Sequence, residues 1–256
     1  MRAILAATAA LLLPMAPASV LAQEPAPVVF SAADGLELHG RLYRGADDAA
    51  PVVLLFHQGG GSAAEYERIA PRLVAAGYHA LAIDQRRGAD RFGVPNQTVL
   101  GMVGPEPSYC DVYPDLEAAM QLTHEIGLDG PMVAWGSSYS AALVMRLGVE
   151  YPEQIAAVLA FSPASGEPMA GCEPEPWAER LQRPLLAVRP AGEMEHEWIA
   201  EQLRQLGDSG AETYVAPDSR HGSSMLDPER NPSDPEPTWA VVERFLRQHV
   251  PTGSED

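Results

Sequence analysis

Short, almost continuous apolar runs alternate with segments of helical periodicity from residue 50 onward. The apolar runs predict buried strands at residues 52–56, 79–84, 132–136, 156–161, 184–189 and 212–216. Apolar character without alternation is typical of parallel strands that helices cover on both faces. The intervening segments predict helices over residues 64–76, 111–126, 140–150, 195–206 and 237–249. Together, these patterns predict an α/β fold with a mostly parallel central sheet.

An Asp34-Gly35 pair precedes this block and separates two stretches of alternating apolar and polar residues. Such a pair between alternating runs is a strong signal for a β-hairpin. We therefore expect an antiparallel hairpin at the N-terminal edge of the sheet.

The chain begins with a single Arg2, an apolar run over residues 4–13, and small residues up to Ala22. This pattern predicts a secretory signal peptide over residues 1–22 and a single α/β domain over residues 23–256. The alternative is a buried first helix. The apolar run is shorter than the ~20 residues that span a bilayer, so we expect no membrane span. A cleaved signal peptide implies a periplasmic or secreted protein.

The formal net charge is −18, and all 17 basic residues are arginine. Because no basic cluster is present to neutralise phosphates, a nucleic-acid partner is not expected. The acidity also predicts long-range repulsion of anionic substrates, which salt screens beyond about 8 Å. The sequence does not indicate an oligomeric state.

Cys110 and Cys172 are the only cysteines, and each lies in one of two long loops that follow strands. In an exported protein such a pair predicts a disulfide; two free, buried thiols are the alternative. A bridge would join the two loops at one rim of the sheet. Two isolated cysteines without a nearby histidine pair make a poor metal site, so neither a metal nor another cofactor is expected.

The stretch Gly136-Ser137-Ser138-Tyr139-Ser140 lies between a predicted strand and a predicted helix. A nucleophile elbow has its serine at the centre of this kind of turn, with small flanking residues where the two backbones pass closely. Ser138 holds the central position. Ser140 stands where glycine is usual, at a modest steric cost. A polar, serine-rich turn without catalytic function is the alternative.

A serine hydroxyl needs a base, and the base needs a carboxylate that orients it. His221 follows the last predicted strand in a Gly- and Ser-rich loop, which makes it the candidate base. The chain order serine, acid, histidine directs the search for the acid to the turn after strand 184–189. Glu193 is preferred there, and Glu195 remains the alternative.

Glycines 59–61 follow the strand at residues 52–56 and can expose backbone N–H groups. The N–H of Gly59, or that of Gln58, could join the N–H of Tyr139 in binding the oxyanion of a tetrahedral intermediate. A phosphate-binding loop is disfavoured because no lysine follows in the required pattern.

These residues resemble those of the α/β-hydrolases, especially the dienelactone-hydrolase-like and small esterase branch. The resemblance rests on four motifs: His57-Gln58-Gly59, Asp84 in a post-strand loop, the Gly136–Ser140 turn, and His221-Gly222. It implies an α/β-hydrolase fold with little or no cap, and catalytic functions for Ser138, His221 and Glu193 or Glu195. It implies structural functions for Asp84 and Arg86.

The leading hypothesis is a serine hydrolase that cleaves a small-molecule carboxylic ester through an acyl-enzyme, without a cofactor. A peptidase or acyltransferase could use the same three residues. A binding protein that kept the fold but lost catalysis is a third alternative. The identity of the ester cannot be read from the sequence.

Overall fold

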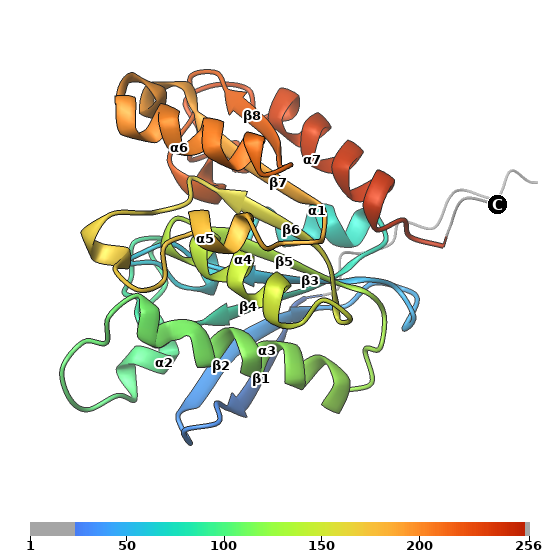
Figure 1. Ribbon diagram of the computed structural model, residues 1–256. Helices are drawn as coiled ribbons and strands as arrows, with labels where there is room; N and C mark the ends of the chain where they lie inside the picture. Colours follow the sequence, from blue (N-terminus) through green and yellow to red (C-terminus); the bar gives the residue numbers. More distant parts are fainter. Residues whose placement is uncertain (1–23, 254–256) are drawn as a thin grey trace, which may run out of the picture.

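The computed structural model describes residues 24–253 and has an eight-stranded sheet at its centre (Figure 1). The predicted signal peptide lies outside the described residues. The strand order is β1-β2-β4-β3-β5-β6-β7-β8. Strand bounds are β1 Ala26–Ser31, β2 Glu37–Tyr43, β3 Val52–Phe56, β4 His79–Asp84, β5 Met132–Ser137, β6 Ile155–Phe161, β7 Leu185–Pro190 and β8 Glu212–Ala216. Every predicted strand is present to within one residue at each end.

Strand β2 pairs antiparallel with β1 and β4, whereas all later pairings are parallel. The predicted N-terminal hairpin is therefore confirmed. Its turn contains Gly35 at φ 85°, a conformation that a residue with a side chain rarely adopts. The fold is that of an α/β-hydrolase, as the resemblance implied.

The α-helices are α1 Ala70–Ala75, α2 Gln97–Leu100, α3 Tyr113–Glu125, α4 Tyr139–Glu150, α5 Glu175–Ala178, α6 Glu197–Asp208 and α7 Glu236–His249. Short 3-10 turns occur at η1 Ala63–Tyr66, η2 Cys110–Val112, η3 Glu167–Met169, η4 Ala191–Glu195 and η5 Gly222–Leu226. The helix predicted over residues 64–76 is wrong in one respect. It is broken into η1 and α1, because Pro71 lacks an N–H and can only begin a new helix there.

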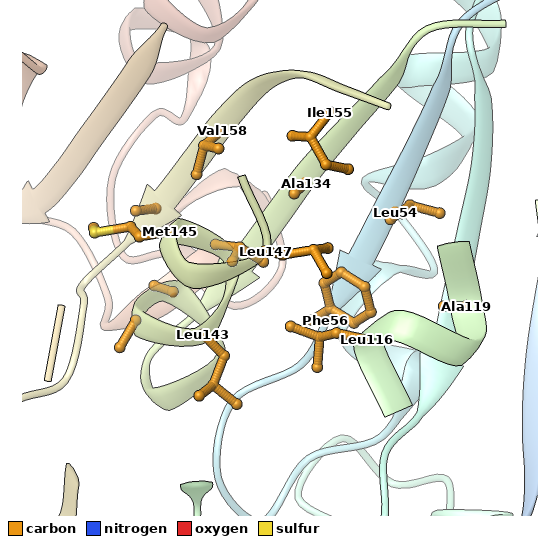
Figure 2. Close-up of a cluster of buried hydrophobic side chains, with 14 of the residues drawn as sticks. Leu54, Phe56, Leu116, Ala119, Ala134, Leu143, Met145, Leu147, Ile155 and Val158 are labelled. Atoms are coloured by element: carbon orange, nitrogen blue, oxygen red, sulfur yellow. The ribbon is translucent and has the colours of Figure 1, made fainter. Parts of the chain in front are cut away.

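Helices cover both faces of the sheet (Figure 1). Alternate residues of β3 face opposite sides: Leu54 and Phe56 pack beneath α3 and α4, whereas Val53 and Leu55 pack beneath α1 and α7. Figure 2 shows the first of these layers, the buried cluster that contains Phe56, Leu116 of α3 and Leu147 of α4. Burying a side chain of this size contributes roughly 1.5–3 kcal/mol. The core therefore fixes the strand ends from which the site is built.

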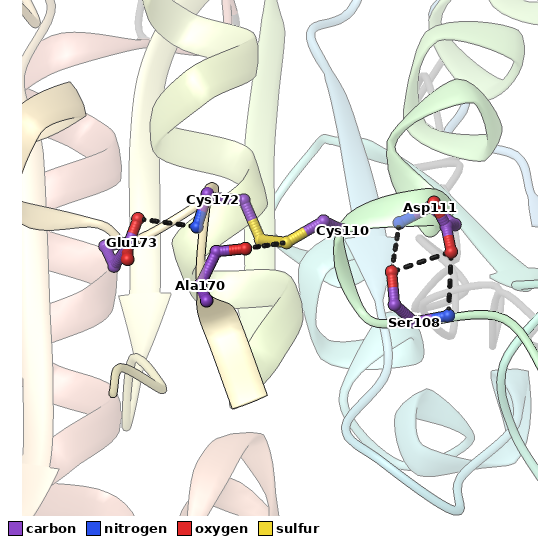
Figure 3. The surroundings of a disulfide bond; sticks show 7 residues. Ser108, Cys110, Asp111, Ala170, Cys172 and Glu173 are labelled. Atoms are coloured by element: carbon purple, nitrogen blue, oxygen red, sulfur yellow. Dashed lines mark hydrogen bonds between the residues drawn. A yellow bond between two sulfur atoms is a disulfide. The ribbon is translucent and has the colours of Figure 1, made fainter. Parts of the chain in front are cut away.

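The predicted disulfide is present between Cys110 and Cys172, whose Cα atoms are 5.7 Å apart (Figure 3). It joins the loop after β4 to the loop after β6. Ser108 and Asp111 brace the first of these loops, because the N–H and the hydroxyl of Ser108 both donate to the Asp111 carboxylate. In residues 24–253, no helix has the length and apolar character that crossing a membrane requires.

Candidate active site

Ser138 lies at the sharp turn between β5 and α4, with φ 60° and ψ −118°. Positive φ is unfavourable for a residue with a side chain, and such strain concentrates at functional sites. The turn is tight because a Cβ on Gly136 would lie 2.3 Å from the Ser140 carbonyl oxygen, so only glycine fits there. Ser138 is half-buried, and within residues 24–253 its Oγ has no hydrogen-bond partner.

The other two serines of the turn are hydrogen-bonded within the core. Ser140 is buried; its Oγ donates to the His57 carbonyl (2.7 Å) and accepts from Gln85 Nε2 (2.9 Å). Ser137 is also buried, and its Oγ donates to Glu65 Oε1 (2.7 Å). The hydroxyl that replaces glycine at position 140 therefore connects the start of α4 to the end of β3.

His221 and Glu193 are in direct contact: His221 Nδ1 lies 2.5 Å from Glu193 Oε1. The second carboxylate oxygen of Glu193 accepts from Arg189 at 2.6 Å. Burial raises the pKa of the Glu193 carboxyl, but the His221 hydrogen bond and the Arg189 charge outweigh it, so the pKa lies below its ordinary value. An ionised carboxylate only accepts, so Nδ1 carries the proton and Nε2 is left as a base.

Glu193 and Glu195 both belong to the 3-10 turn η4, and α6 begins only at Glu197. Glu195 is exposed, whereas the Glu193 side chain is 17% exposed and reaches the imidazole. Of the two carboxylates left open by the sequence, the structure therefore brings Glu193 to His221. The imidazole itself is 46% exposed, which leaves it accessible to a substrate.

Ser138 and His221 belong to adjoining segments, although no hydrogen bond joins Ser138 Oγ to the imidazole in this structure. The Ser223 N–H donates to Ser137 Oγ at 2.9 Å, which attaches the histidine loop to the serine turn. The Gly222 N–H donates to Ser162 Oγ, and the Ser138 N–H donates to the neighbouring Phe161 carbonyl. Hydrogen bonds between catalytic groups are often long without substrate and shorten in the complex.

The predicted oxyanion donors differ in availability. Within residues 24–253 the Gly59 N–H has no hydrogen-bond partner. The Tyr139 N–H is the first of α4 and so has no acceptor within that helix. The Gln58 N–H, by contrast, donates to Glu65 Oε2 at 2.8 Å. Gly59 is therefore the better candidate of the two.

His57 is fully buried and holds this loop in place. The Gln85 N–H donates to His57 Nε2 (3.1 Å), so the proton is on Nδ1, which donates to the Gln58 carbonyl at 2.9 Å. Burial lowers the pKa of His57 and favours this neutral form. Asp84 and Arg86 are likewise structural: Asp84 accepts from the Ala63 N–H, and Arg86 binds Asp115.

A cavity of about 380 Å³ opens beside His221 and has three arginines in its wall. The other lining residues are Gln58, Phe92 and Ser224. Arg230 pairs with Asp227 at 3.0 Å, but Arg91 and Arg220 have no ion pair within the described part of the chain. The cavity wall is therefore locally cationic in an acidic protein, which the net charge alone does not predict.

Two further residues of the site, Arg189 and Glu65, were not predicted from the sequence. Arg189 ends the apolar run of β7, and a single charge at the carboxyl end of a buried strand was the available signal. Glu65 is fully buried, yet the sequence around it looks like an ordinary helix start.

In residues 24–253, no three His, Cys, Asp or Glu side chains are grouped as metal ligands would be.

Solved structures with this fold include hydrolases of different kinds. An esterase from Pyrococcus furiosus matches with a TM-score of 0.65 at 18% identity, covering 89% of this chain and 91% of the esterase. A dienelactone hydrolase from Anabaena variabilis matches with a TM-score of 0.65 at 18% identity, covering 89% and 100%.

An acylaminoacyl peptidase from Pyrococcus horikoshii matches with a TM-score of 0.66 at 14% identity, covering 93% of this chain. This chain spans only 43% of that peptidase. At these identities the likeness shows a shared fold. No match was found among curated protein sequences.

The family model described as "Serine aminopeptidase, S33" (Hydrolase_4) matches residues 47–218, which is more than half of the chain. The matched region contains the Ser138 turn, the disulfide and Glu193, and it ends three residues before His221. The chain is therefore an α/β-hydrolase that belongs to the serine aminopeptidase S33 family.

Proposed function

We propose that this protein is a serine hydrolase that cleaves a carboxylic ester through an acyl-enzyme. The observation that carries the proposal is the strained Ser138, whose hydroxyl lacks a hydrogen-bond partner in the described chain, next to the segment that holds the His221–Glu193 pair. A turn of this shape has a conformational free-energy cost. Such strain is typical of sites where a function requires the serine to project from the sheet edge.

In the proposed mechanism, His221 Nε2 takes the proton of the Ser138 hydroxyl as the oxygen attacks the ester carbonyl carbon. The imidazole becomes a cation, which the Glu193 carboxylate stabilises at Nδ1. Collapse of the tetrahedral intermediate expels the alcohol, which receives the proton from Nε2. Water, activated by the same nitrogen, then hydrolyses the acyl-Ser138 ester and releases the acid.

The N–H groups of Gly59 and Tyr139 are proposed to bind the oxyanion of both intermediates. Gly59 lacks a side chain, so a substrate can approach its backbone closely. His57 Nδ1 donates to the Gln58 carbonyl and so fixes this loop. The Gly59 N–H therefore need not reorganise during the reaction. The site needs no cofactor for these steps.

The cationic cavity beside His221 bears on the substrate. An aminopeptidase must bind the ammonium group of a peptide N-terminus, and a carboxylate is the natural partner for that cation. The lining of this cavity contains arginines and has no Asp or Glu. It therefore favours an ester with an anionic group over a peptide with a free amine. Amide hydrolysis and acyl transfer remain the alternatives to be tested on the same triad.

The disulfide supports the proposal that the protein is exported, because such bonds persist in oxidising compartments. A periplasmic or extracellular location would also provide access to esters outside the cell. Detection of the mature protein in the periplasmic or culture fraction, with a new N-terminus at residue 23, tests this part.

The decisive comparison is the hydrolysis of p-nitrophenyl acetate by the wild type and by Ser138→Ala, with Ser209→Ala as a matched control on the exposed end of α6. We expect Ser138→Ala to lose roughly 10⁶-fold in kcat and the control to keep full activity. Activity of Ser138→Ala equal to that of the wild type would end the proposal. An amide substrate and an added alcohol acceptor separate esterase from peptidase and transferase chemistry.

A further inference from the structure

Glu65 is a fully buried carboxylate that the proposed mechanism does not use. It lies in the 3-10 turn η1 and accepts three hydrogen bonds. The Gln58 N–H donates to Oε2 (2.8 Å), while Gln58 Nε2 (3.0 Å) and Ser137 Oγ (2.7 Å) donate to Oε1. Burying a charge is unfavourable even when it is hydrogen-bonded, so its presence at this position calls for a reason.

Each partner of Glu65 is a direct neighbour of a group in the proposed machinery. Gln58 precedes Gly59, the proposed oxyanion donor, and Ser137 precedes Ser138, the proposed nucleophile. The carboxylate thus joins the loop after β3 to the turn after β5, two segments that are otherwise far apart in the sequence.

The histidine loop is attached to the same group. Ser137 Oγ donates to Glu65 and also accepts the Ser223 N–H at 2.9 Å, two residues after His221. A Cβ on Gly222 would lie 2.2 Å from Ser137 Oγ and 3.6 Å from Glu65 Oε1, so the loop backbone packs directly on this pair. Gln58 Nε2 also contacts Ser224 Oγ at 3.3 Å.

We propose that Glu65 is a positioning residue: its carboxylate fixes the oxyanion loop, the serine turn and the histidine loop in one mutual arrangement. The inference rests on the proposed function, since it assigns Glu65 to the hydrolytic site. Glu65 touches neither substrate nor reacting atoms. Its effect is to hold the three segments in register, and a misplacement of about 1 Å between reacting groups can cost about 10²-fold in rate.

The Glu65 carboxylate is matched to three donor groups, two from Gln58 and one from Ser137. Burial raises the pKa of Glu65 above its ordinary value, and the hydrogen bonds from Gln58 and Ser137 limit that rise. All three groups donate, and an ionised carboxylate, which only accepts, can take all three hydrogen bonds at once. Glutamine at this position keeps the shape but replaces one acceptor oxygen with an NH₂ group.

The test compares Glu65→Gln with Glu67→Gln, an exposed glutamate two residues away. Steady-state kinetics on p-nitrophenyl acetate are combined with inhibition by phenylboronic acid, which forms a tetrahedral adduct with an active-site serine. We expect Glu65→Gln to lose about 10²-fold in kcat with KM changed less than about threefold. Phenylboronic acid should bind more weakly by a similar factor, and Glu67→Gln should match the wild type in each measurement.

A purely structural function predicts a different result. Loss of folded protein lowers the number of active sites but leaves kcat per titrated site and the boronate affinity unchanged. If Glu65→Gln folds poorly, Ser137→Ala removes the same connection from the other side and should reproduce the kcat loss. The double variant should lose no more than the larger single loss, because both remove one network.

Two failures can be told apart. Wild-type kcat and boronate affinity in both Glu65→Gln and Ser137→Ala would overturn the positioning function while Ser138-dependent hydrolysis stands. Absence of any Ser138-dependent hydrolysis in the wild type would overturn the proposed function, and this inference with it.

Discussion

Arg189 and Glu193 form an ion pair, with 2.6 Å between Nη1 and Oε2, on the side of the carboxylate away from His221. Arg189 is almost fully buried at the end of β7 and also donates to the Pro163 carbonyl and the Gln202 side chain. The proposed catalytic acid is therefore held by a cation that is itself anchored to the loop after β6 and to α6.

Replacing Arg189 is expected to lower activity, although Arg189 is not proposed to contact the substrate. Arg189→Ala removes one of the two groups that orient Glu193, so His221 loses its fixed tautomer and position. We predict a decrease in kcat on the order of 10²-fold, with little change in KM. The same substitution at Arg244, an exposed ion-paired arginine on α7, should have no effect. Equal kcat values for the two variants would show that Arg189 does not support the acid.

Glu193→Gln should produce a larger loss, because the neutral amide no longer stabilises the imidazolium or fixes the Nδ1–H tautomer. The corresponding loss in serine proteases is about 10⁴-fold in kcat. Glu195→Gln is the matched control in the same 3-10 turn and should retain activity. A greater loss in Glu195→Gln would identify Glu195 as the acid instead.

The lowered pKa of Glu193 also predicts how stability depends on pH. Its interactions stabilise the folded state fully above the ordinary carboxyl pKa of 4.5, and this contribution is lost as the pH falls through the lower folded-state value. The difference in unfolding free energy between the wild type and Glu193→Gln should therefore shrink as the pH is lowered below about 4.5. Urea unfolding across that range measures it. A difference that stays constant or grows would contradict the assignment of charge.

The disulfide should contribute substantially to stability. The bond between Cys110 and Cys172 closes a loop with a sequence separation of 62 residues, so its loss is expected to cost roughly 4 kcal/mol in unfolding free energy. The Cys110→Ser/Cys172→Ser double variant tests this by denaturant unfolding, with the reduced wild type as a second measurement. A loss well below 1 kcal/mol would mean that the rim is held by packing alone.

Arg91 and Arg220 should favour anionic esters. We predict that the wild type prefers 4-acetoxybenzoate to its methyl ester, or 4-nitrophenyl hydrogen adipate to its methyl ester, depending on which end of the ester enters the cavity. Arg91→Ala/Arg220→Ala should lose roughly 10- to 100-fold in kcat/KM on the anionic ester, the usual effect of a charge-assisted hydrogen bond.

The neutral esters should be cleaved equally well by the wild type and by this double variant. Arg247→Ala serves as the control, because it removes a positive charge far from the cavity. Arg247 lies in the last turn of α7, and the residues that follow this helix contact Tyr78 at the amino-terminal ends of the strands. No preference for an anion in the wild type would remove the cavity from the account of the substrate.

Most of the fold could be predicted from the sequence because its signals are local. Apolar runs such as residues 52–56 have no surface-facing polar positions, and Asp34-Gly35 specifies its own turn. The strand-to-helix context of Gly136–Ser140 was enough to predict the tight turn, since close backbone approach demands a small residue at position 136.

The rest depends on contacts between distant segments. The sequence could not decide between Glu193 and Glu195, because a 3-10 turn and the first turn of an acidic helix look alike in composition. The burial of Glu65 follows from its bond to Ser137, 72 residues away, and nothing local signals it. Likewise, Arg91 and Arg220 line the same cavity only because two loops that are distant in the sequence lie together in the fold.

The most direct test of the central claim is covalent labelling with a fluorophosphonate, followed by peptide mass spectrometry. We expect a single adduct on Ser138 in the native wild type, greatly slowed labelling in His221→Ala, and none in heat-denatured protein. Failure of the native protein to react at Ser138, or labelling at Ser137 or Ser140 instead, would contradict it.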